Sequence, residues 1–203
     1  MAFPTIAVTA GSGTTINTLP NAGQAVKTES LSVVMASDYT QTQADGTAYV
    51  WDSVGTNGTI TLTSLANAAA RQGTKADLGA TRAKKYMASI LSKMAVAATD
   101  GTELELWWAP SPSGTAGTSN PGNVSGTDAA YTTPAEYKRQ LQFIGSLVLS
   151  NAAGTGAQYQ VVGPFAPRLR YGSPVLVNAA TGQALSGTAG DHVITIWPST
   201  EAG

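Results

Sequence analysis

Two glutamates on one expected strand are the first residues whose spacing could do chemistry. Glu103 and Glu105 alternate with apolar residues in the run 102–108, so both carboxylates would lie on one face of a strand. At positions i and i+2 they would stand roughly 7 Å apart, a separation at which two carboxylates can act as the acid and base of a glycosidase. Nothing nearby supplies the apolar pocket that raises the pKa of one partner. A solvated strand face is the favoured interpretation, and a glycan-degrading enzyme is kept as an alternative.

His192 is the only histidine, and the chain has no cysteine. Without cysteine, disulfides and Cys-ligated zinc or iron–sulfur centres are excluded. No Gly-x-Ser-x-Gly elbow accompanies His192, so an ordinary strand residue is the favoured interpretation. Residues 11–15 are glycine-rich but lack the Gly-Lys-Thr ending of a phosphate-binding loop. The sequence therefore predicts no enzyme, no catalytic residues, no cofactor and no metal ion.

Trp107 and Trp108 stand side by side on the same expected strand. Alternation turns them to opposite faces, so one of them meets water unless a second sheet or a subunit covers it. Because Trp is enriched at protein interfaces, we expect Trp107 to be an interface residue. A platform on which a sugar ring stacks is the alternative.

The charge content bears on the kind of partner. Charged residues make up 11% of the 203 residues, with 11 basic and 12 acidic side chains and a formal net charge of -1, against roughly 25% charged residues in an average domain. Binding to phosphates needs clustered Lys and Arg, and the short cluster Arg82, Lys84 and Lys85 fits a solvated edge or ion pairs with a neighbouring subunit. No stretch approaches the roughly 18 apolar residues of a membrane span. We therefore expect neither nucleic acid nor a membrane as a partner, but other protein.

The elements that position these residues are β-strands. From residue 47 onward, short runs of β-branched, aromatic and aliphatic residues are separated by turn residues. Within the strand expected at 139–150, Phe143, Gly145 and Leu147 share one side. The expected strands include 102–108, 139–150, 158–162, 174–178 and 191–198.

Two further segments complete the strand pattern. The dipeptide Asn57-Gly58 between 48–54 and 59–65 predicts a hairpin. The segment 83–98 is ambiguous, because its apolar residues recur at a helical period that, taken alone, slightly favours a helix. Counted as a strand, it brings the total to about eight, the number found in a jelly roll. The predicted fold class is all-β, an antiparallel β-sandwich of jelly-roll type.

Two polar segments lie outside this pattern. Residues 1–46 are turn-rich and predict an extended N-terminal arm that is flexible or laid on a partner. Residues 110–135, within a domain of 47–203, are mainly Gly, Ser, Thr, Asn, Pro and Ala, which is long for a loop without structure. We expect this loop to be the most exposed contact surface. The candidate interface residues of the arm and the loop are Leu31, Val33, Val34 and Tyr131.

Several segments resemble virion proteins of tailed bacteriophages. Residues 19–25 (LPNAGQA) and 30–38 (SLSVVMASD) are similar to an arm with the pattern NAGQAxxxxSLPVVxASDQ, with Ser32 in place of its proline and Tyr39 in place of its last glutamine. The stretches that resemble one family of these proteins are 70–79, 106–113, 125–131, 142–147 and 170–178.

The resemblance implies a β-sandwich and favours a strand at 83–98. It carries over no catalytic residues. It implies a capsid decoration, cement or minor head protein at the capsid surface of a virion that assembles in the host bacterial cytoplasm. The expected partners are the major capsid protein and other copies of the chain in a homotrimer. A tail-fibre or baseplate module that binds a receptor or glycan is the alternative.

Overall fold

The computed structural model describes residues 8–9, 15–16, 48–55, 57–132 and 134–199. The chain divides into two compact units, residues 1–40 and 41–203. In the described part of the first unit, β1 (Val8–Thr9) and β2 (Thr15–Ile16) form a two-stranded antiparallel sheet. The rest of the arm expected at 1–46, including its boundary, lies outside the described residues.

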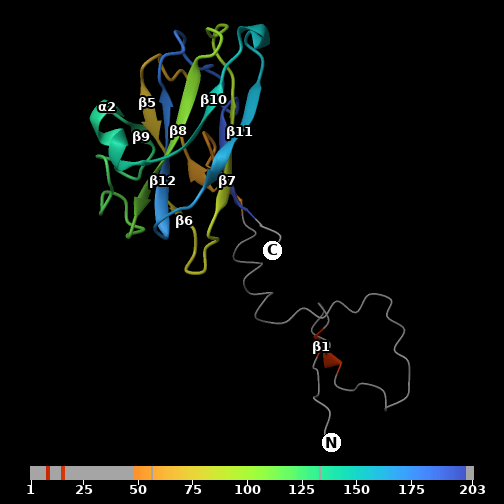
Figure 1. Cartoon of the computed structure of the whole chain (residues 1–203), viewed down its shortest axis with the longest axis vertical. Helices are drawn as coiled ribbons and strands as arrows, with labels where there is room; N and C mark the ends of the chain where they lie inside the picture. Colours follow the sequence, from red (N-terminus) through yellow and green to blue (C-terminus); the bar gives the residue numbers. More distant parts are fainter. Residues whose placement is uncertain (1–7, 10–14, 17–47, 56, 133, 200–203) are drawn as a thin grey trace, which may run out of the picture. The chain divides into compact units, whose positions relative to one another are not determined.

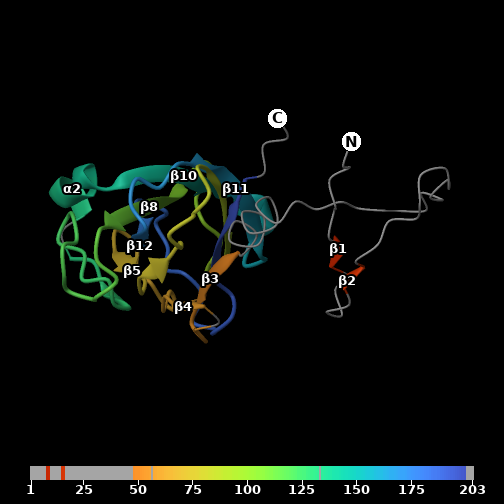
Figure 2. The same cartoon turned by 90° about the horizontal axis from the view of Figure 1, so that it is seen from below.

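The second unit consists of two mainly antiparallel sheets that pack face to face, seen as two layers in Figure 2. The strands of the first sheet are, in order, β10 (Gln142–Val148), β8 (Glu103–Ser111), β12 (Tyr171–Asn178), β5 (Ala70–Gln72) and β9 (Ala129–Ala130), with β6 (Ala76–Asp77) also paired to β12. Those of the second sheet are β11 (Gln158–Phe165), β7 (Tyr86–Ser92), β13 (Val193–Pro198), β3 (Tyr49–Asp52) and β4 (Gly58–Thr59). The helical segments are α2 (Pro134–Tyr137), η1 (Lys138–Gln140) and η2 (Asn151–Ala153).

The strand order is that of a jelly roll, and Figure 1 labels the strands β10, β8, β12 and β5 of its first sheet. Without the two-residue strands β4, β6 and β9, eight main strands follow one another along the chain from β3 to β13. When these eight strands are numbered 1 to 8 along the chain, their order is 1-8-3-6 in the second sheet and 2-7-4-5 in the first. This arrangement places the first and last strands side by side and winds the chain through both layers as two Greek keys. The predicted antiparallel β-sandwich of about eight strands is confirmed.

The core between the sheets is apolar with aromatic rings at its centre. Alternation along β8 turns Leu104, Leu106 and Trp108 inward, and all three are fully buried. The ring of Trp108 contacts Trp51 of β3, with centroids 5.9 Å apart, and Phe165 of β11, with centroids 5.6 Å apart. Both sheets therefore contribute to one aromatic cluster. The inward position of Leu104, Leu106 and Trp108 agrees with the alternation predicted for residues 102–108.

The hairpin predicted around Asn57-Gly58 is wrong. β3 and β4 pair in parallel, with Trp51 opposite Gly58. The carboxylate of Asp52 accepts hydrogen bonds from two of the backbone N–H groups that follow it, at 2.9 and 2.6 Å, which turns the chain directly after β3. The side chain of Asn57 instead accepts a hydrogen bond from the backbone N–H of Val50 at 3.1 Å.

The ambiguous segment 83–98 contains a strand, β7, so its helical interpretation is wrong. Tyr86 and Ile90 point into the core, whereas Met87 and Leu91 lie on the opposite face and are half-buried. When a strand carries apolar residues on both faces, some of them lie three or four positions apart, which imitates the period of a helix. The helical period therefore reflects two apolar faces of one strand.

The edge strands of the two sheets, β10 and β11, approach each other at two β-bulges. The bulge in β10 lies between Phe143 and Gly145, and that in β11 lies between Val161 and Gly163. A Cβ atom on Gly145 would lie 1.6 Å from the carbonyl oxygen of Val162, so only glycine fits at this crossing. Because of the bulge, Phe143 does not share a side with Gly145 and Leu147, so that prediction is wrong. Its side chain turns outward and is 50% exposed.

We expect Gly145→Ala to lower the free energy of unfolding by about 1 to 3 kcal/mol or more, as overpacking does. The added methyl group would meet a backbone carbonyl, which cannot rotate away. Urea denaturation of the variant measures this loss, and Ser146→Ala, a change at the next position of β10, serves as the control with an expected effect within about 0.5 kcal/mol. An unchanged unfolding midpoint for Gly145→Ala would contradict the close approach of β10 and β11.

Candidate functional site

Three of the five predicted interface residues, Leu31, Val33 and Val34, lie outside the described residues. The structure places the other two, Trp107 and Tyr131, on the outer face of the first sheet and in the chain that covers it. The two residues are 24 positions apart in the sequence but belong to one region of the fold. Tyr131 is part of a cluster of buried apolar residues outside the main core, and Trp107 packs against that cluster.

Tyr131 is buried against its own domain. Its side chain is 3% exposed, and its hydroxyl donates a hydrogen bond to the carbonyl oxygen of Gly122 at 2.6 Å. Together with Val124 and Leu141 it packs on the outward-facing side chains of the sheet. The sheet residues of this cluster are Ala70, Ala109, Val175 and Val177. The described residues of the range 112–141, the covering loop, thus close the outer face of β8, β12 and β5.

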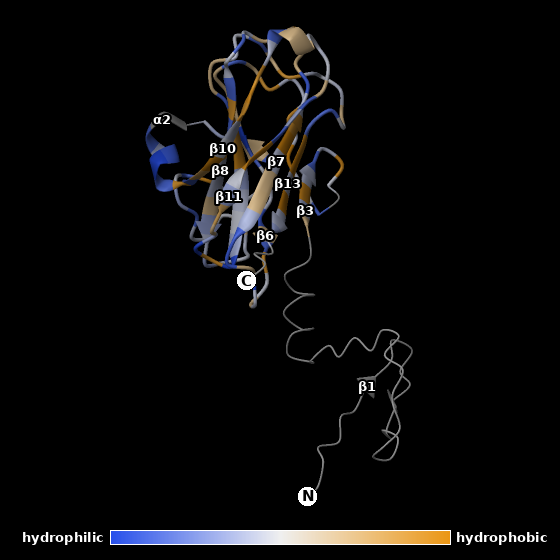
Figure 3. Cartoon of the chain, turned by 45° about the vertical axis from the view of Figure 1, so that its right-hand side comes forward, coloured by the Kyte–Doolittle hydropathy of each residue, from blue (hydrophilic) through white to orange (hydrophobic). Residues whose placement is uncertain are grey.

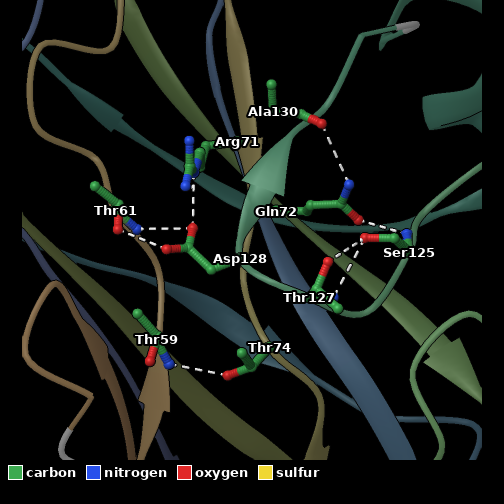
Figure 4. Close-up of polar contacts among 9 residues, drawn as sticks. All are labelled: Thr59, Thr61, Arg71, Gln72, Thr74, Ser125, Thr127, Asp128 and Ala130. Atoms are coloured by element: carbon green, nitrogen blue, oxygen red, sulfur yellow. Dashed lines mark hydrogen bonds and ion pairs between the residues drawn. The ribbon is translucent and has the colours of Figure 1, made fainter.

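The covering loop is held on the sheet by polar contacts (Figure 4). Asp128 accepts hydrogen bonds from Arg71 Nε at 2.7 Å and from the hydroxyl of Thr61 at 2.5 Å. Nearby, the side-chain oxygen of Gln72 accepts a hydrogen bond from the backbone N–H of Ser125 at 2.6 Å. Burial alone would raise the pKa of Asp128, but the hydrogen bonds from Arg71 and Thr61 hold it below its usual value. The carboxylate therefore stays ionised and keeps the loop in place at neutral pH.

Lys75 organises the first half of the covering loop. Its ammonium donates hydrogen bonds to the carbonyl oxygens of Ser113, Thr115 and Thr118 at 2.8, 2.7 and 3.0 Å. These acceptors would otherwise need water. The tip of the loop, residues 114–119, is exposed, whereas exposed and buried or half-buried residues alternate over 120–132. The segment expected to be a polar contact surface is therefore largely a folded cover for its own sheet.

Trp107 lies at the rim of this cover. Its Nε1 donates a hydrogen bond to the carboxylate of Glu105 at 2.9 Å, and the ring of Phe143 packs against it with centroids 4.8 Å apart. The ammonium of Lys138 lies 5.4 Å from the ring centroid and pairs with Glu105 at 2.9 Å. Trp108 is fully buried in the core. Neither indole therefore offers the open platform that a stacked sugar needs.

The same contacts bear on the paired glutamates. Glu105 forms an ion pair with Lys138 and accepts a hydrogen bond from the indole N–H of Trp107. Glu103 is exposed at the start of β8. A glycosidase acid needs an apolar environment that favours its protonated form. The structure gives Glu105 an ion pair and an indole N–H donor instead of an apolar environment.

His192 forms a hydrogen-bonded pair with Ser92. Nδ1 lies 2.9 Å from the hydroxyl oxygen of Ser92, and Nε2 lies 3.0 Å from the carbonyl oxygen of Ser186. Because a carbonyl can only accept, Nε2 carries the proton and Nδ1 accepts from Ser92. Ser92 is 1% exposed and His192 is 3% exposed, so the hydroxyl is closed to a substrate. The pair joins β7 to the chain that precedes β13.

A surface that the sequence did not single out is the outer face of the second sheet, whose strands β11, β7, β13 and β3 lie side by side in Figure 3. Pairing aligns Tyr159, Leu91 and Val193 in one row across β11, β7 and β13. Tyr159 is 62% exposed, and the other two are half-buried. The outward residues of this open face are Val50, Met87, Ser89, Leu91, Tyr159, Val161, Pro164, Val193, Thr195 and Trp197, together with Asp52.

The open face is nearly free of charge. Asp52 is the only residue charged at neutral pH among the outward residues of the described strands β11, β7, β13 and β3. The sequence signal that could have revealed this face is the presence of apolar residues on both sides of β7 and β13, since strands covered on both faces show this pattern. The helical interpretation of 83–98 concealed it.

No protein-family model, curated protein or solved structure matches the chain. Within the described ranges, no helix is long and apolar enough to cross a membrane. In the same part of the chain, no three or more His, Asp or Glu side chains are grouped to hold a metal ion.

We expect the free energy of unfolding to fall as the pH drops below about 6.5. Burial lowers the pKa of His192 from its usual 6.5. Between that pH and the lower pKa of the folded state, the unfolded chain binds more protons, so stability decreases as the pH falls. Urea denaturation between pH 8 and pH 5 measures this slope.

The control is His192→Gln, which retains a donor and an acceptor but cannot take up the proton. Its stability should change less over the same range. Asp191, beside His192 and paired with Lys93 at 2.7 Å, has a lowered pKa and contributes only at more acidic pH. Equal slopes for the two proteins would contradict the role assigned to His192.

Proposed function

We propose that this protein is a non-enzymatic structural component of a bacteriophage virion, a capsid decoration or cement protein that stabilises the head by bridging capsomers. The observation that carries the proposal is the open face of β11, β7, β13 and β3. It supports an assembly role because a flat, apolar and almost uncharged surface is suited to burial against protein. The virion setting comes from the resemblance of residues 19–38 and of five later stretches to phage virion proteins.

The size of the open face indicates how strong its contacts are. Three rows of side chains spaced roughly 7 Å apart along strands about 4.8 Å apart cover on the order of 400 Å². This is the size of the largest apolar patch on a typical monomer, which is often functional. Two such faces together would bury about 800 Å², less than the roughly 1,200 to 2,000 Å² of a stable interface. Contacts through this face are therefore weak in pairs and become effective in an assembly that holds many copies.

The occupant we assign to the open face is another copy of the same chain. With only Asp52 as a charged outward residue, two or three copies can meet without strong like-charge repulsion. The opposite outer face is already covered by residues 112–141. Among its described residues, the domain therefore has one covered and one uncovered sheet face, and a homotrimer on the capsid would cover the second.

The polar groups of the domain support a structural role over catalysis. The Ser92–His192 pair is buried, and Glu105 is engaged by Lys138 and Trp107. Burial of apolar surface contributes about 25 cal/mol per Å², and a decoration protein repeats each contact over the whole shell. Small gains at each site would then add up to a head that resists internal pressure.

We expect Leu91→Glu to weaken self-association without unfolding the domain. Leu91 lies between Tyr159 and Val193 on the central strand pair of the open face, in the row at the end of β7, so a carboxylate there would have to be desolvated in the assembly. Sedimentation equilibrium over a concentration series measures association, and thermal melting checks the fold. The control is Val54→Glu, the same charge change at a residue that is 81% exposed in the turn between β3 and β4. Equal association of the two variants would contradict self-association through this face.

The virion role is tested by counting copies in purified particles. Quantitative mass spectrometry against the major capsid protein should give hundreds of copies per virion if the protein decorates the head lattice. A count of a few to a few dozen would overturn the decoration role and place the protein at the tail or portal end. Absence from particles would overturn the virion setting altogether.

A further inference from the structure

A second surface lies at one end of the sandwich, where the chain between β6 and β7 meets the chain between β11 and β12. Arg82 Nη2 donates a hydrogen bond to the carbonyl oxygen of Arg168 at 3.2 Å, and the backbone N–H of Leu78 donates to the carbonyl oxygen of Arg170 at 2.9 Å. The two loops, residues 78–85 and 166–170, therefore lie side by side. Both leave the sandwich at the end marked by β6 in Figure 1.

This end gathers positive charge. The basic residues of the two loops are Arg82, Lys84, Lys85, Arg168 and Arg170. The acid next to them in the described chain is Asp77, whose carboxylate binds Arg170 at 2.6 Å through both oxygens. We call the surface formed by residues 78–85 and 166–170 the basic end. In a chain with a formal net charge of -1, it is a local excess of cations.

Basic residues elsewhere in the described chain mostly have partners within the domain. Arg71 pairs with Asp128 at 2.7 Å, and Lys93 pairs with Asp191 at 2.7 Å. Lys138 pairs with Glu105, and the ammonium of Lys75 is enclosed by loop carbonyls. Among the described residues, by contrast, Arg82, Lys84 and Arg168 have no carboxylate partner. The charges of these three residues are therefore available to a partner.

The surroundings of these cations favour protein over nucleic acid. Leu169 is exposed among them, so the surface mixes an apolar side chain with guanidinium and ammonium groups. Tight binding to duplex DNA typically uses about 6 to 10 phosphate contacts, more than the cations of this end provide. Guanidinium groups bind carboxylates in a bidentate manner, and charges around an apolar contact give orientation and a faster association rate.

We infer that the basic end docks on an acidic protein surface, with carboxylates of the partner against Arg82, Lys84 and Arg168 and an apolar contact at Leu169. The inference goes beyond the proposed function and holds whether or not the protein belongs to a virion. It also separates two surfaces by chemistry, because the open face is uncharged and the basic end is charged. Binding through the basic end weakens as salt rises, since exposed charges are screened beyond about 8 Å at physiological ionic strength.

The test is a titration of the isotope-labelled full chain, followed by NMR, with poly-L-glutamate as the acidic probe. We expect amide shifts confined to residues 78–85 and 166–170 and a dissociation constant that rises several-fold between 50 and 200 mM salt. A duplex DNA of the same total charge forms the second arm and should bind more weakly. Binding of DNA as tight as that of poly-L-glutamate would overturn the choice of an acidic protein.

Two variants with the same charge change make the test specific. Lys84→Glu lies in the basic end, whereas Arg139→Glu changes an exposed residue of η1. We expect Lys84→Glu to raise the dissociation constant at least fivefold and Arg139→Glu to change it less than twofold, with the NMR spectrum confirming that both fold. Equal effects would show that only net charge matters, and absence of binding to poly-L-glutamate would show that the end is merely solvated. Either result would overturn the inference.

Discussion

The two sheets of this jelly roll each carry apolar side chains on the face turned away from the core, and water-exposed apolar area has to be covered or left as an interaction surface. The chain covers one of these faces itself. Val124, Tyr131 and Leu141 pack on the outside of β8, β12 and β5. The other face, on β11, β7, β13 and β3, stays open within the described domain. This difference between the two faces determines which surface is available for assembly.

Covering the first face requires polar groups, because residues 112–141 contain few apolar side chains. Asp128 and Lys75 hold the loop through side-chain and backbone partners that lie far away in the sequence. A half-buried charge stabilises the fold only when its hydrogen-bonding groups are satisfied. Asp128 meets this condition through its ion pair with Arg71 and the hydrogen bond from Thr61, and Lys75 meets it through the loop carbonyls. Arg71, Lys75 and Lys93 thus hold the fold together, whereas Arg82, Lys84 and Arg168 of the basic end have no carboxylate partner among the described residues.

The sequence predicts those features that depend on neighbours along the chain. The alternation of residues 103–108 correctly identifies the inward side of β8, and the strands at 142–148, 158–165, 171–178 and 193–198 are found within a few residues. Features that depend on distant partners escape it. The parallel pairing of β3 and β4 follows from a carboxylate that turns the chain after Asp52, and the bulge at Gly145 follows from the approach of a backbone in the other sheet. The cover over the first sheet depends on Arg71 and Asp128, 57 residues apart.

The two free surfaces differ in what they could contribute to an assembly. Apolar contact on the open face would supply affinity but little selectivity, because any flat apolar surface of the right size satisfies it. Charge on the basic end would supply little affinity in water, since exposed ion pairs are worth at most about 1 kcal/mol each, but it rejects partners of the wrong sign. A subunit that has to join its own copies and a different protein needs both kinds of surface. The uncharged face suits contacts between identical chains, and the charged end suits the unlike partner.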